Sequence, residues 1–306
     1  MASNPITSSQ FTRLLDKRLR EVFEDKFKEL PTMIPQLYRT MDSEGAFEEF
    51  YEVGALPDIP EFNGTLEYIA PSPGYYTKIE HKEYAGGTMT ERKFIDDKKY
   101  AVLDNKAGML GTSAARVREK IGVRPFANAF SAAFDFQTSE EGIALCGSHT
   151  TKVAVSTSTG FTNAGTSALS KTSVAATRLL MRKFRNELGE RIEINPDTLI
   201  VPDNLADTAE EIVGTEKGLY SAEGTVNVQY KRFKVIPYLR LDDYDTNNWF
   251  MVDSAQMKKW LVFIDRIKAT DAHTIDFETF YVKDSVYMRL SNGFLDWRFI
   301  MGHNVS

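Results

Sequence analysis

The stretch TLEYIAPSPGYYTKIEHKEYAGGTMTERKF, residues 65–94, contains three segments that favour β-strands. They are residues 67–69, 75–79 and 88–94, where Tyr and Thr are frequent. The stretch has too few Leu, Ile and Val residues for both faces of such strands to be buried. The pattern predicts a long hairpin that stands away from the main core. Prolines and glycines punctuate the wider run from 47 to 98: Pro57, Pro60, Gly64, Pro71, Pro73, Gly74, Gly86 and Gly87.

The N-terminal segment predicts an amphipathic helix. Ser8 or Ser9 can cap its start, and Pro31 and Pro35 end it. Its other face is charged, so the helix can pack on its own domain, as most do, or on a neighbour. Apolar residues recur at three- and four-residue spacing: Phe11, Leu14, Leu15, Leu19, Val22, Phe23 and Phe27.

The remaining chain mixes helices and strands without a regular βαβ alternation or an internal repeat, which indicates the α+β class. Residues 98–134 favour a helix, but Gly108, Gly111, Gly122 and Pro125 predict that it is kinked or broken. The Ser-, Thr- and Gly-rich run 147–172 predicts an exposed loop. We expect further helices at 167–188 and 205–213 and strands at 198–201, 225–241 and 274–301.

Length and composition indicate a globular protein. The chain has 306 residues, 42% of them hydrophobic and 26% charged, which is ample to bury a core in one or two domains. It lacks a run near the roughly 18 apolar residues of a membrane span, and its first ten residues do not resemble a secretory signal. A soluble, cytoplasmic product is expected. The net charge of −6 argues against a dedicated nucleic-acid reader but leaves casual contact with DNA open.

Residue patterns that would indicate catalysis or metal binding are weak in this sequence. The single cysteine, Cys146, excludes an internal disulfide and a cysteine-rich zinc site. Cys146 and His149 could form a nucleophile and base, but the Ser/Gly loop fixes no geometry between them. A small buried Cys and a loop His that bonds backbone is the favoured interpretation. The acidic run 242–245 indicates a solvated turn, because it lacks the Gly and Glu of a calcium loop. No catalytic, cofactor-binding or metal-binding residue is predicted.

Five stretches, in order, carry a resemblance to a known family. The chain resembles the Mu-like major head subunit family of phage capsid proteins, which share the Hong Kong-ninety-seven-type shell fold. The terminal stretch is Asp296-Trp297-Arg298-Phe299-Ile300-Met301-Gly302-His303-Asn304. The earlier ones are LPDIPEFNG at 56–64, the hairpin ending in Phe94-Ile95-Asp96-Asp97, GIALCGSH at 142–149, and PDTLIVP at 196–202 with the helix that follows.

The resemblance implies a tile of a self-assembling shell with four parts. They are an N-terminal arm (1–46), an extended hairpin or E-loop (47–97), a peripheral domain with a long spine helix (98–149 and 266–306) and an axial domain (150–265). The implied partners are further copies, as hexamers and pentamers, and packaged double-stranded DNA bound without sequence specificity. Scaffolding, portal or decoration proteins are further candidates, and no membrane or cofactor is expected. The implied location is the virion capsid, assembled in the host bacterial cytoplasm.

Charged residues on the helix and hairpin are the expected contacts between subunits. Exposed ion pairs contribute only about 0.2–1 kcal/mol each, so they fix register better than they stabilise one subunit. Two alternatives stay open: another phage structural protein, of the tail tube or associated with the portal, and a cysteine-dependent hydrolase. The expected contact residues are Arg13, Lys17, Arg20, Tyr75, Lys78, Glu91, Arg92 and Lys93.

Overall fold

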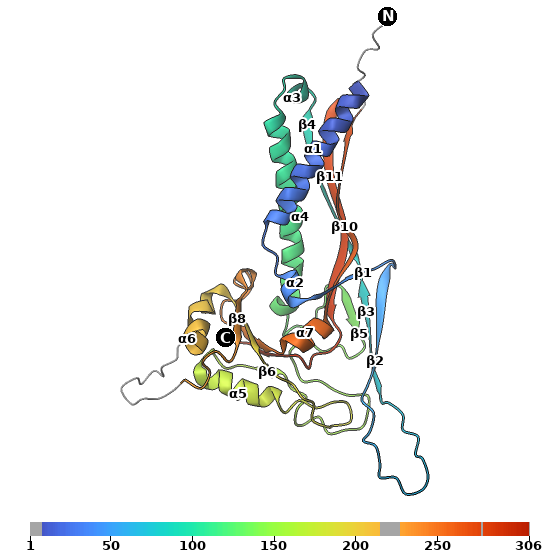
Figure 1. The fold of residues 1–306 in the computed structure, drawn as a ribbon, viewed down its shortest axis with the longest axis vertical. Coiled ribbons are helices and arrows are strands. Elements are labelled where there is room, and N and C mark those ends of the chain that lie inside the picture. The colour runs from blue at the N-terminus through green and yellow to red at the C-terminus, as the bar shows by residue number, and fades with distance from the viewer. Residues whose placement is uncertain (1–7, 215–226, 277, 306) are drawn as a thin grey trace, which may run out of the picture.

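Helix α4 (Tyr100–Ala127) runs along a four-stranded sheet, and together they form a long arm of the molecule (Figure 1). This computed structural model describes residues 8–214, 227–276 and 278–305, with side chains from Lys17 onward. Arg118 joins helix to sheet, since its guanidinium donates to both carboxylate oxygens of Asp265 at 2.6 Å. The strand order is β1 (Arg39–Asp42), β10 (Leu261–Ile275), β11 (Tyr281–Phe294) and β4 (Lys82–Glu91), with β1 parallel to β10 and the other pairs antiparallel.

Helix α1 (Ser8–Glu29) packs along α4, which confirms the predicted N-terminal helix. Leu19 is buried beside Leu103 of α4, and Phe23 is buried beside Leu110. From Lys17 onward, the helix therefore packs its apolar side within its own subunit. The short helices α2 (Ile34–Leu37) and α3 (Lys93–Asp96) lead from α1 to β1 and from β4 to α4.

Helix α4 is unbroken over 28 residues, so the prediction of a broken helix was wrong. Its glycines serve close packing instead. A Cβ on Gly111 would lie 2.5 Å from the carbonyl oxygen of Phe23, and one on Gly122 would lie 3.1 Å from Cγ1 of Ile34. Because glycine lacks this atom, α1 and α2 can approach α4 more closely than a side chain would allow.

Pro125 is accommodated near the end of α4 by a side chain from the sheet. A proline cannot donate the usual hydrogen bond to the carbonyl four residues earlier. That carbonyl, of Ile121, accepts instead from the side-chain amide of Asn292 on β11, at 2.7 Å. The helix therefore continues to Ala127 without an unpaired carbonyl at this position.

A five-stranded sheet forms the centre of the broader body. Helices α5 (Lys171–Met181) and α6 (Ala206–Gly214) pack on one of its faces, where Val174 and Ala209 share a buried cluster with Trp249. Side chains alternate between faces along a strand, so Phe250 points to the opposite cluster. The strand order is β6 (Ala164–Gly165), β12 (Ile300–His303), β9 (Trp249–Val252), β7 (Thr198–Val201) and β8 (Lys234–Pro237).

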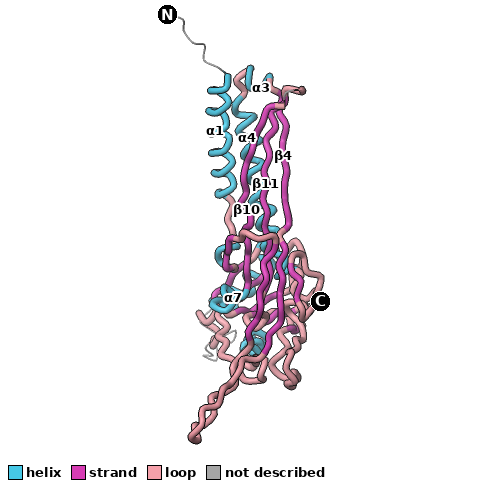
Figure 2. The backbone as a smooth tube through the Cα atoms, turned by 90° about the vertical axis from the view of Figure 1, so that its right-hand side faces the viewer, coloured by secondary structure: helices cyan, strands magenta, loops and turns pink. Residues whose placement is uncertain are grey.

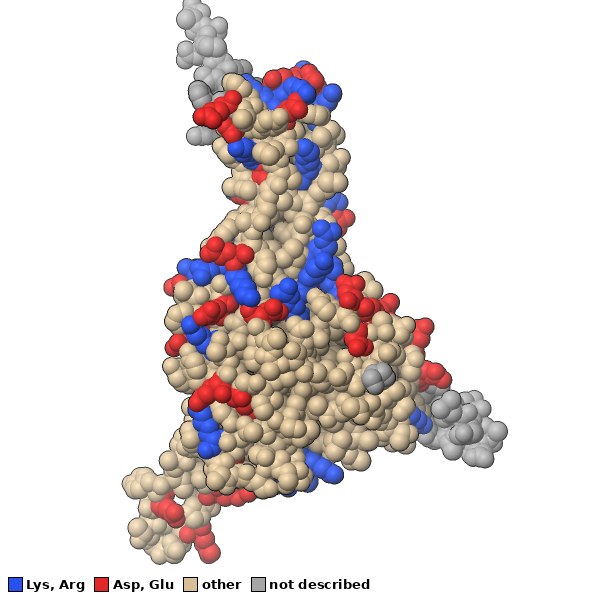
Figure 3. Space-filling model, turned by 180° about the vertical axis from the view of Figure 1, so that it is seen from behind, with Lys and Arg blue, Asp and Glu red and all other residues tan. Residues whose placement is uncertain are grey.

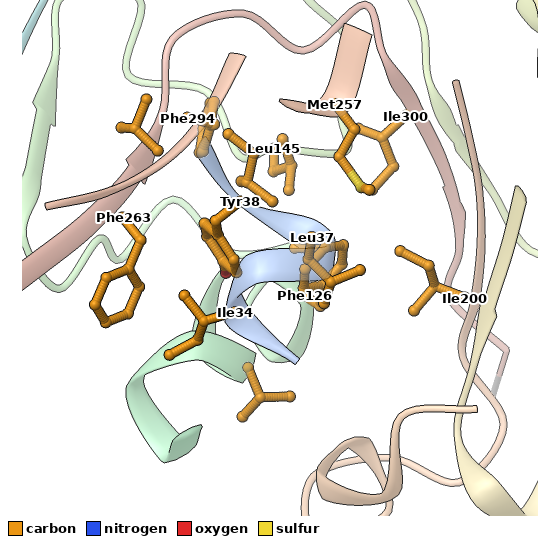
Figure 4. Packing of buried hydrophobic residues seen from close by; sticks show 14 of the residues in the cluster. Ile34, Leu37, Tyr38, Phe126, Leu145, Ile200, Met257, Phe263, Phe294 and Ile300 are labelled. Carbon is orange, nitrogen blue, oxygen red and sulfur yellow. The ribbon is translucent and has the colours of Figure 1, made fainter. Parts of the chain in front are cut away.

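The opposite cluster is the largest core and joins body to arm. Figure 4 shows Tyr38 from the start of the chain packed near Phe126 of α4 and Phe263 of β10. The Tyr38 hydroxyl donates to the carbonyl of Gly122 at 2.5 Å, so this buried polar atom is paired. Helix α7 (Ser254–Trp260) borders the same core, with its N-terminus capped by Asp253.

Strands β2 (Phe47–Val53) and β3 (Pro73–Glu80) form an antiparallel hairpin, and β5 (Gln137–Ser139) pairs with β3. Residues 54–72 between them contain no helix or strand and extend away from the body, opposite the free end of the arm (Figures 1 and 2). A projecting hairpin is therefore present. Residues 88–94, expected in that hairpin, lie elsewhere: β4 pairs with β11 along the arm and covers what would be an open edge.

Other elements follow the sequence prediction in part. Strand β7 matches 198–201, and the helix predicted at 205–213 is present as α6 after a short 3-10 turn, η1 (Asp203–Leu205). Helix α5 ends at Met181 rather than 188, because Phe184 turns inward against Trp297. Of the strand expected at 225–241, only β8 forms before a second 3-10 turn, η3 (Leu239–Leu241), and residues 225–226 lie outside the described part of the chain.

Candidate assembly surfaces

The tip of the hairpin, residues 54–72, exposes a group of large apolar side chains. Ile59 is 88% exposed and Tyr68 is 90% exposed, and the same segment exposes Leu56, Phe62 and Leu66. Scattered apolar residues are normal on a surface, but a contiguous group marks a contact site. Burial of such surface against another molecule would contribute about 25 cal/mol per Å² of apolar area.

The charge of the tip is of one sign. It contains Asp58, Glu61 and Glu67 and neither Lys nor Arg. Figure 3 shows red acidic atoms and no blue basic ones on this projection, at the lower left. The tip is therefore apolar and acidic, and a surface complementary to it would be apolar and basic.

The root of the hairpin is fixed by a buried ionic cluster. Arg298, only 8% exposed, contacts Glu187 at 2.6 Å, Asp296 at 3.0 Å and Glu52 of β2 at 3.4 Å. The backbone N–H of Ala55 also donates to Glu187, at 3.3 Å. A buried charge that loses its partners is strongly destabilising, so these groups hold the root in one position.

Three carboxylates share the single guanidinium, and Glu52 is the one that favours its protonated form. Burial and the neighbouring charge of Asp296 raise the pKa of Glu52 to about 8. Burial is the largest influence on Glu187 and acts in the same sense, but Arg298 and hydrogen bonds, among them that from the N–H of Ala55, together outweigh it, and the pKa of Glu187 is lowered. The cluster therefore exchanges a proton near neutral pH at the root of the hairpin.

The predicted contact residues Tyr75 and Lys78 lie on β3, between root and body. The Tyr75 hydroxyl pairs with the hydroxyl of Thr150 at 2.9 Å. The Lys78 ammonium donates to Glu80 at 2.6 Å and lies 4.2 Å from the ring centroid of Phe47. Both side chains are half-buried and have partners within the subunit.

The predicted contact residues of the N-terminal helix lie along the arm. Lys17 pairs with Glu21 at 3.9 Å, and Arg20 pairs with Asp271 of β10 at 3.3 Å. The Lys17 side chain is exposed, whereas the pairing of Arg20 ties α1 to the sheet. The side chain of Arg13 lies outside the described residues.

Glu91, Arg92 and Lys93 lie at the free end of the arm, where β4 meets α3, and not on the hairpin. Glu91 pairs with Lys93, and Arg92 contacts Asp96 at 3.9 Å. Figures 1 and 2 show the first turns of α1 at the same end. The structure thus distributes the predicted contact residues over three places and does not bring them together in one site.

Cys146 and His149 occupy separate environments. Cys146 is buried, which raises the pKa of its thiol. The imidazole of His149 stacks on Trp297 with ring centroids 4.2 Å apart, and its nitrogens face Glu141 at 3.1 Å and Asn163 at 3.2 Å. His149 therefore bonds side chains rather than the expected backbone, and both of its nitrogens are engaged away from a thiol.

Among the residues that the structure describes, no group of three or more His, Cys, Asp or Glu side chains is placed to hold a metal ion. Within 8–214, 227–276 and 278–305, no helix combines the length and the apolar character that a membrane crossing requires. The acidic run 242–245 forms a turn as predicted, in which Asp245 accepts from the N–H groups of Asn247 and Asn248.

A family model described as phage capsid protein matches residues 75–298, most of the chain, and the chain belongs to that family. No curated protein matches it. Solved structures with a similar fold include the mature capsid of bacteriophage PhiM1 (TM-score 0.58, 9% identity, 90% of this chain and 88% of that one). The procapsid of bacteriophage JBD30 is similar too (TM-score 0.54, 13% identity, 98% and 77%), as is a virus-like particle from Pyrococcus furiosus (TM-score 0.51, 12% identity, 94% and 98%).

Family and fold agree with each other. At these identities the solved structures show the fold alone, and the family match supplies the class of protein. The chain is a structural major capsid protein of a phage head, with the mixed α+β capsid fold that its sequence predicted. The resemblance is confirmed at the level of the phage capsid protein family.

Proposed function

We propose that this chain assembles with copies of itself, as pentamers and hexamers, into a closed shell around double-stranded DNA. The shell contacts the DNA without sequence specificity. The net charge of −6 would keep packed DNA from binding tightly to the shell, because like charges repel. Scaffolding, portal or decoration proteins are further partners under this proposal, and the shell forms in the host cytoplasm. The structural neighbours named above include assembled capsids, which supports self-assembly.

The observation that carries the proposal is the hairpin: an exposed apolar tip on a buried, ion-paired root. Nothing in the described subunit covers Ile59, Phe62 or Tyr68, which lie 73–90% exposed. In a shell, a neighbouring copy would bury these apolar side chains, because one surface of a subunit meets a different surface of the next subunit. The free end of the arm, with Glu91, Arg92 and Lys93, and the exposed side of α1 are proposed as the other contact surfaces.

The division into four parts remains a proposal: an N-terminal arm (1–46), an E-loop (47–97), a peripheral domain (98–149 with 266–306) and an axial domain (150–265). The strand pairing supports 47–80 as the projecting part of the E-loop, because β4 belongs to the long sheet. A structural role for Cys146 and His149 is also part of the proposal, supported by the burial of the thiol and the engagement of the imidazole.

The test replaces only the tip, residues 56–70, with a short Gly/Ser linker and leaves β2, β3 and the ionic root intact. Shortening a loop changes its closure cost by only about 0.6 kcal/mol per halving, so the subunit should fold and melt as before. Closed shells should be lost in electron micrographs. Shells that form normally without the tip would contradict the proposed role of the hairpin.

A milder variant separates contact from fold. Ile59→Ser with Phe62→Ser should leave subunit stability within about 0.5 kcal/mol, because both side chains are exposed. Its shell yield should fall all the same. Rods or open tubes from the unmodified protein, instead of closed shells, would favour the tail-tube alternative.

A further inference from the structure

One flank of the body is basic without a carboxylate partner. Helix α5 and the turn after it, residues 171–185, contain no Asp or Glu. Arg182 and Lys183 are exposed. In the described part of the chain, none of the basic side chains of this segment forms an ion pair. They are Lys171, Arg178, Arg182, Lys183 and Arg185.

The basic side chains of this flank repel one another. Partial burial, and then the charges of Arg232 and Arg182, lower the pKa of Arg178. The Nε of Arg178 is buried and has no hydrogen-bond partner. Beside these groups, Leu179 is 53% exposed and Leu180 is 43% exposed. An acidic and partly apolar partner would relieve the repulsion and cover the leucines. We name residues 171–185 the basic flank.

A second flank has the opposite character. Residues 203–211, which lead into and along α6, carry Asp203, Asp207, Glu210 and Glu211, all exposed, and no Lys or Arg. Asp242 accepts hydrogen bonds from the N–H groups of Asp203 and Asn204, at 2.9 and 3.2 Å, and so joins residues 239–245 to them.

This second flank also exposes apolar side chains, because Leu239 is 69% exposed and Tyr244 is 50% exposed. No carboxylate of 203–211 or 242–245 pairs with a Lys or Arg in the described residues. Acidic atoms gather along this side of the body in Figure 3, to the right of the base of the arm. Residues 203–211 and 239–245 together hold seven carboxylates and one basic residue, Arg240, and we name them the acidic flank.

The helices of the two flanks cover different strands of the same sheet. Helix α5 packs over β12 and β9, whereas α6 packs over β7 and β8 at the other end of the strand order. Figure 1 accordingly shows α6 at the left of the body and α5 along its lower side. A ring of identical subunits needs two different surfaces that match each other, one on each side of the subunit.

We propose that the basic flank of one subunit docks against the acidic flank of the next copy in the ring. The proposal rests on the proposed shell assembly and names two surfaces that meet within it. Charge and apolar character are complementary on both sides, so one contact would satisfy both flanks. Contact of the basic flank with DNA would leave the carboxylates and Tyr244 of the acidic flank without a role.

The test is a charge swap. Arg182→Glu with Lys183→Glu reverses the basic flank, and Glu210→Lys with Glu211→Lys reverses the acidic one. All four side chains are exposed, so both variants should melt close to the unmodified protein. Each alone should lower the yield of closed shells by at least about tenfold, since like charges then face each other. The combined variant, which restores opposite charges, should recover to within about threefold of the unmodified yield.

Arg182→Lys with Lys183→Arg is the matched control, since it keeps both charges and should assemble normally. Normal assembly of either reversal would overturn the proposal. So would a combined variant that stays as poor as the single reversals. Normal shells that retain less DNA in the basic-flank reversal would point to DNA contact instead. If the unmodified protein formed no rings or shells, the proposed function itself would fail together with this inference.

Discussion

Two glycines on one helix provide a controlled test of how the N-terminal helix docks. Gly108 and Gly111 both lie in the interior of α4 and both face α1. A Cβ on Gly111 would lie 2.5 Å from the carbonyl oxygen of Phe23 and 3.3 Å from the backbone nitrogen of Phe27. A Cβ on Gly108 would lie 3.2 Å from Cγ of Lys26, a flexible side chain that can move aside.

The expected magnitudes follow from these neighbours. Either Gly→Ala change gains about 1 kcal/mol from the helix preference of alanine. At Gly111 the new methyl meets rigid backbone, and overpacking of this kind costs about 1–3 kcal/mol. Because the gain is common to both variants, Gly111→Ala should be less stable than Gly108→Ala by about 1–3 kcal/mol.

Chemical unfolding of the isolated subunit, followed by circular dichroism, measures this difference. Limited proteolysis gives an independent readout, since α1 should be cut earlier in Gly111→Ala than in Gly108→Ala. Equal stability of the two variants, or a more stable Gly111→Ala, would refute the close approach of α1 and α4.

Three further predictions concern the ionic root and the cysteine. Arg298→Ala should cost about 3–5 kcal/mol of unfolding free energy, because it leaves buried carboxylates unpaired; a loss below about 1 kcal/mol would show that the cluster is solvated. Since the folded-state pKa of Glu52 is raised from 4.5 to about 8, its contribution to stability is full below pH 4.5 and is lost as pH rises through about 8. Melting temperatures of Glu52→Gln against pH should lack this decline, and an unchanged pH profile would assign the proton elsewhere. Cys146 should resist an aromatic disulfide reagent in the folded protein and react after denaturation, and rapid reaction of the folded protein would revive the hydrolase alternative.

Elements with a strong local pattern were predictable from sequence. The apolar spacing up to Phe27 and the prolines after it define α1, and the turn at Asn195-Pro196 with Pro202 brackets β7. The proline- and glycine-rich composition indicated a projection, and residues 54–72 form its tip. In each case the signal lies within a few residues, which is the range over which propensity and periodicity act.

Features that depend on partners distant in the chain were missed. Glycines in α4 were interpreted as breaks, but Gly111 faces a helix 88 positions earlier in the sequence, at Phe23. Strand β4 has the composition of a free hairpin strand, but its place is decided by β11, which lies almost 200 residues later. The Arg298 cluster draws Glu52 and Glu187 from equally separate segments, and no local pattern marks them.

The ion-paired root fixes the hairpin at one end, so a force applied to the exposed tip is transmitted to the root. A pull on the tip reaches Glu52 and Ala55 first and passes through Arg298 and Glu187. Arg298 lies two residues before β12, which is hydrogen-bonded between β6 and β9 in the five-stranded sheet. Tension between subunits would therefore pass from the tip through Arg298 into the five-stranded sheet, in which β7, β9 and β12 are buried along their whole length.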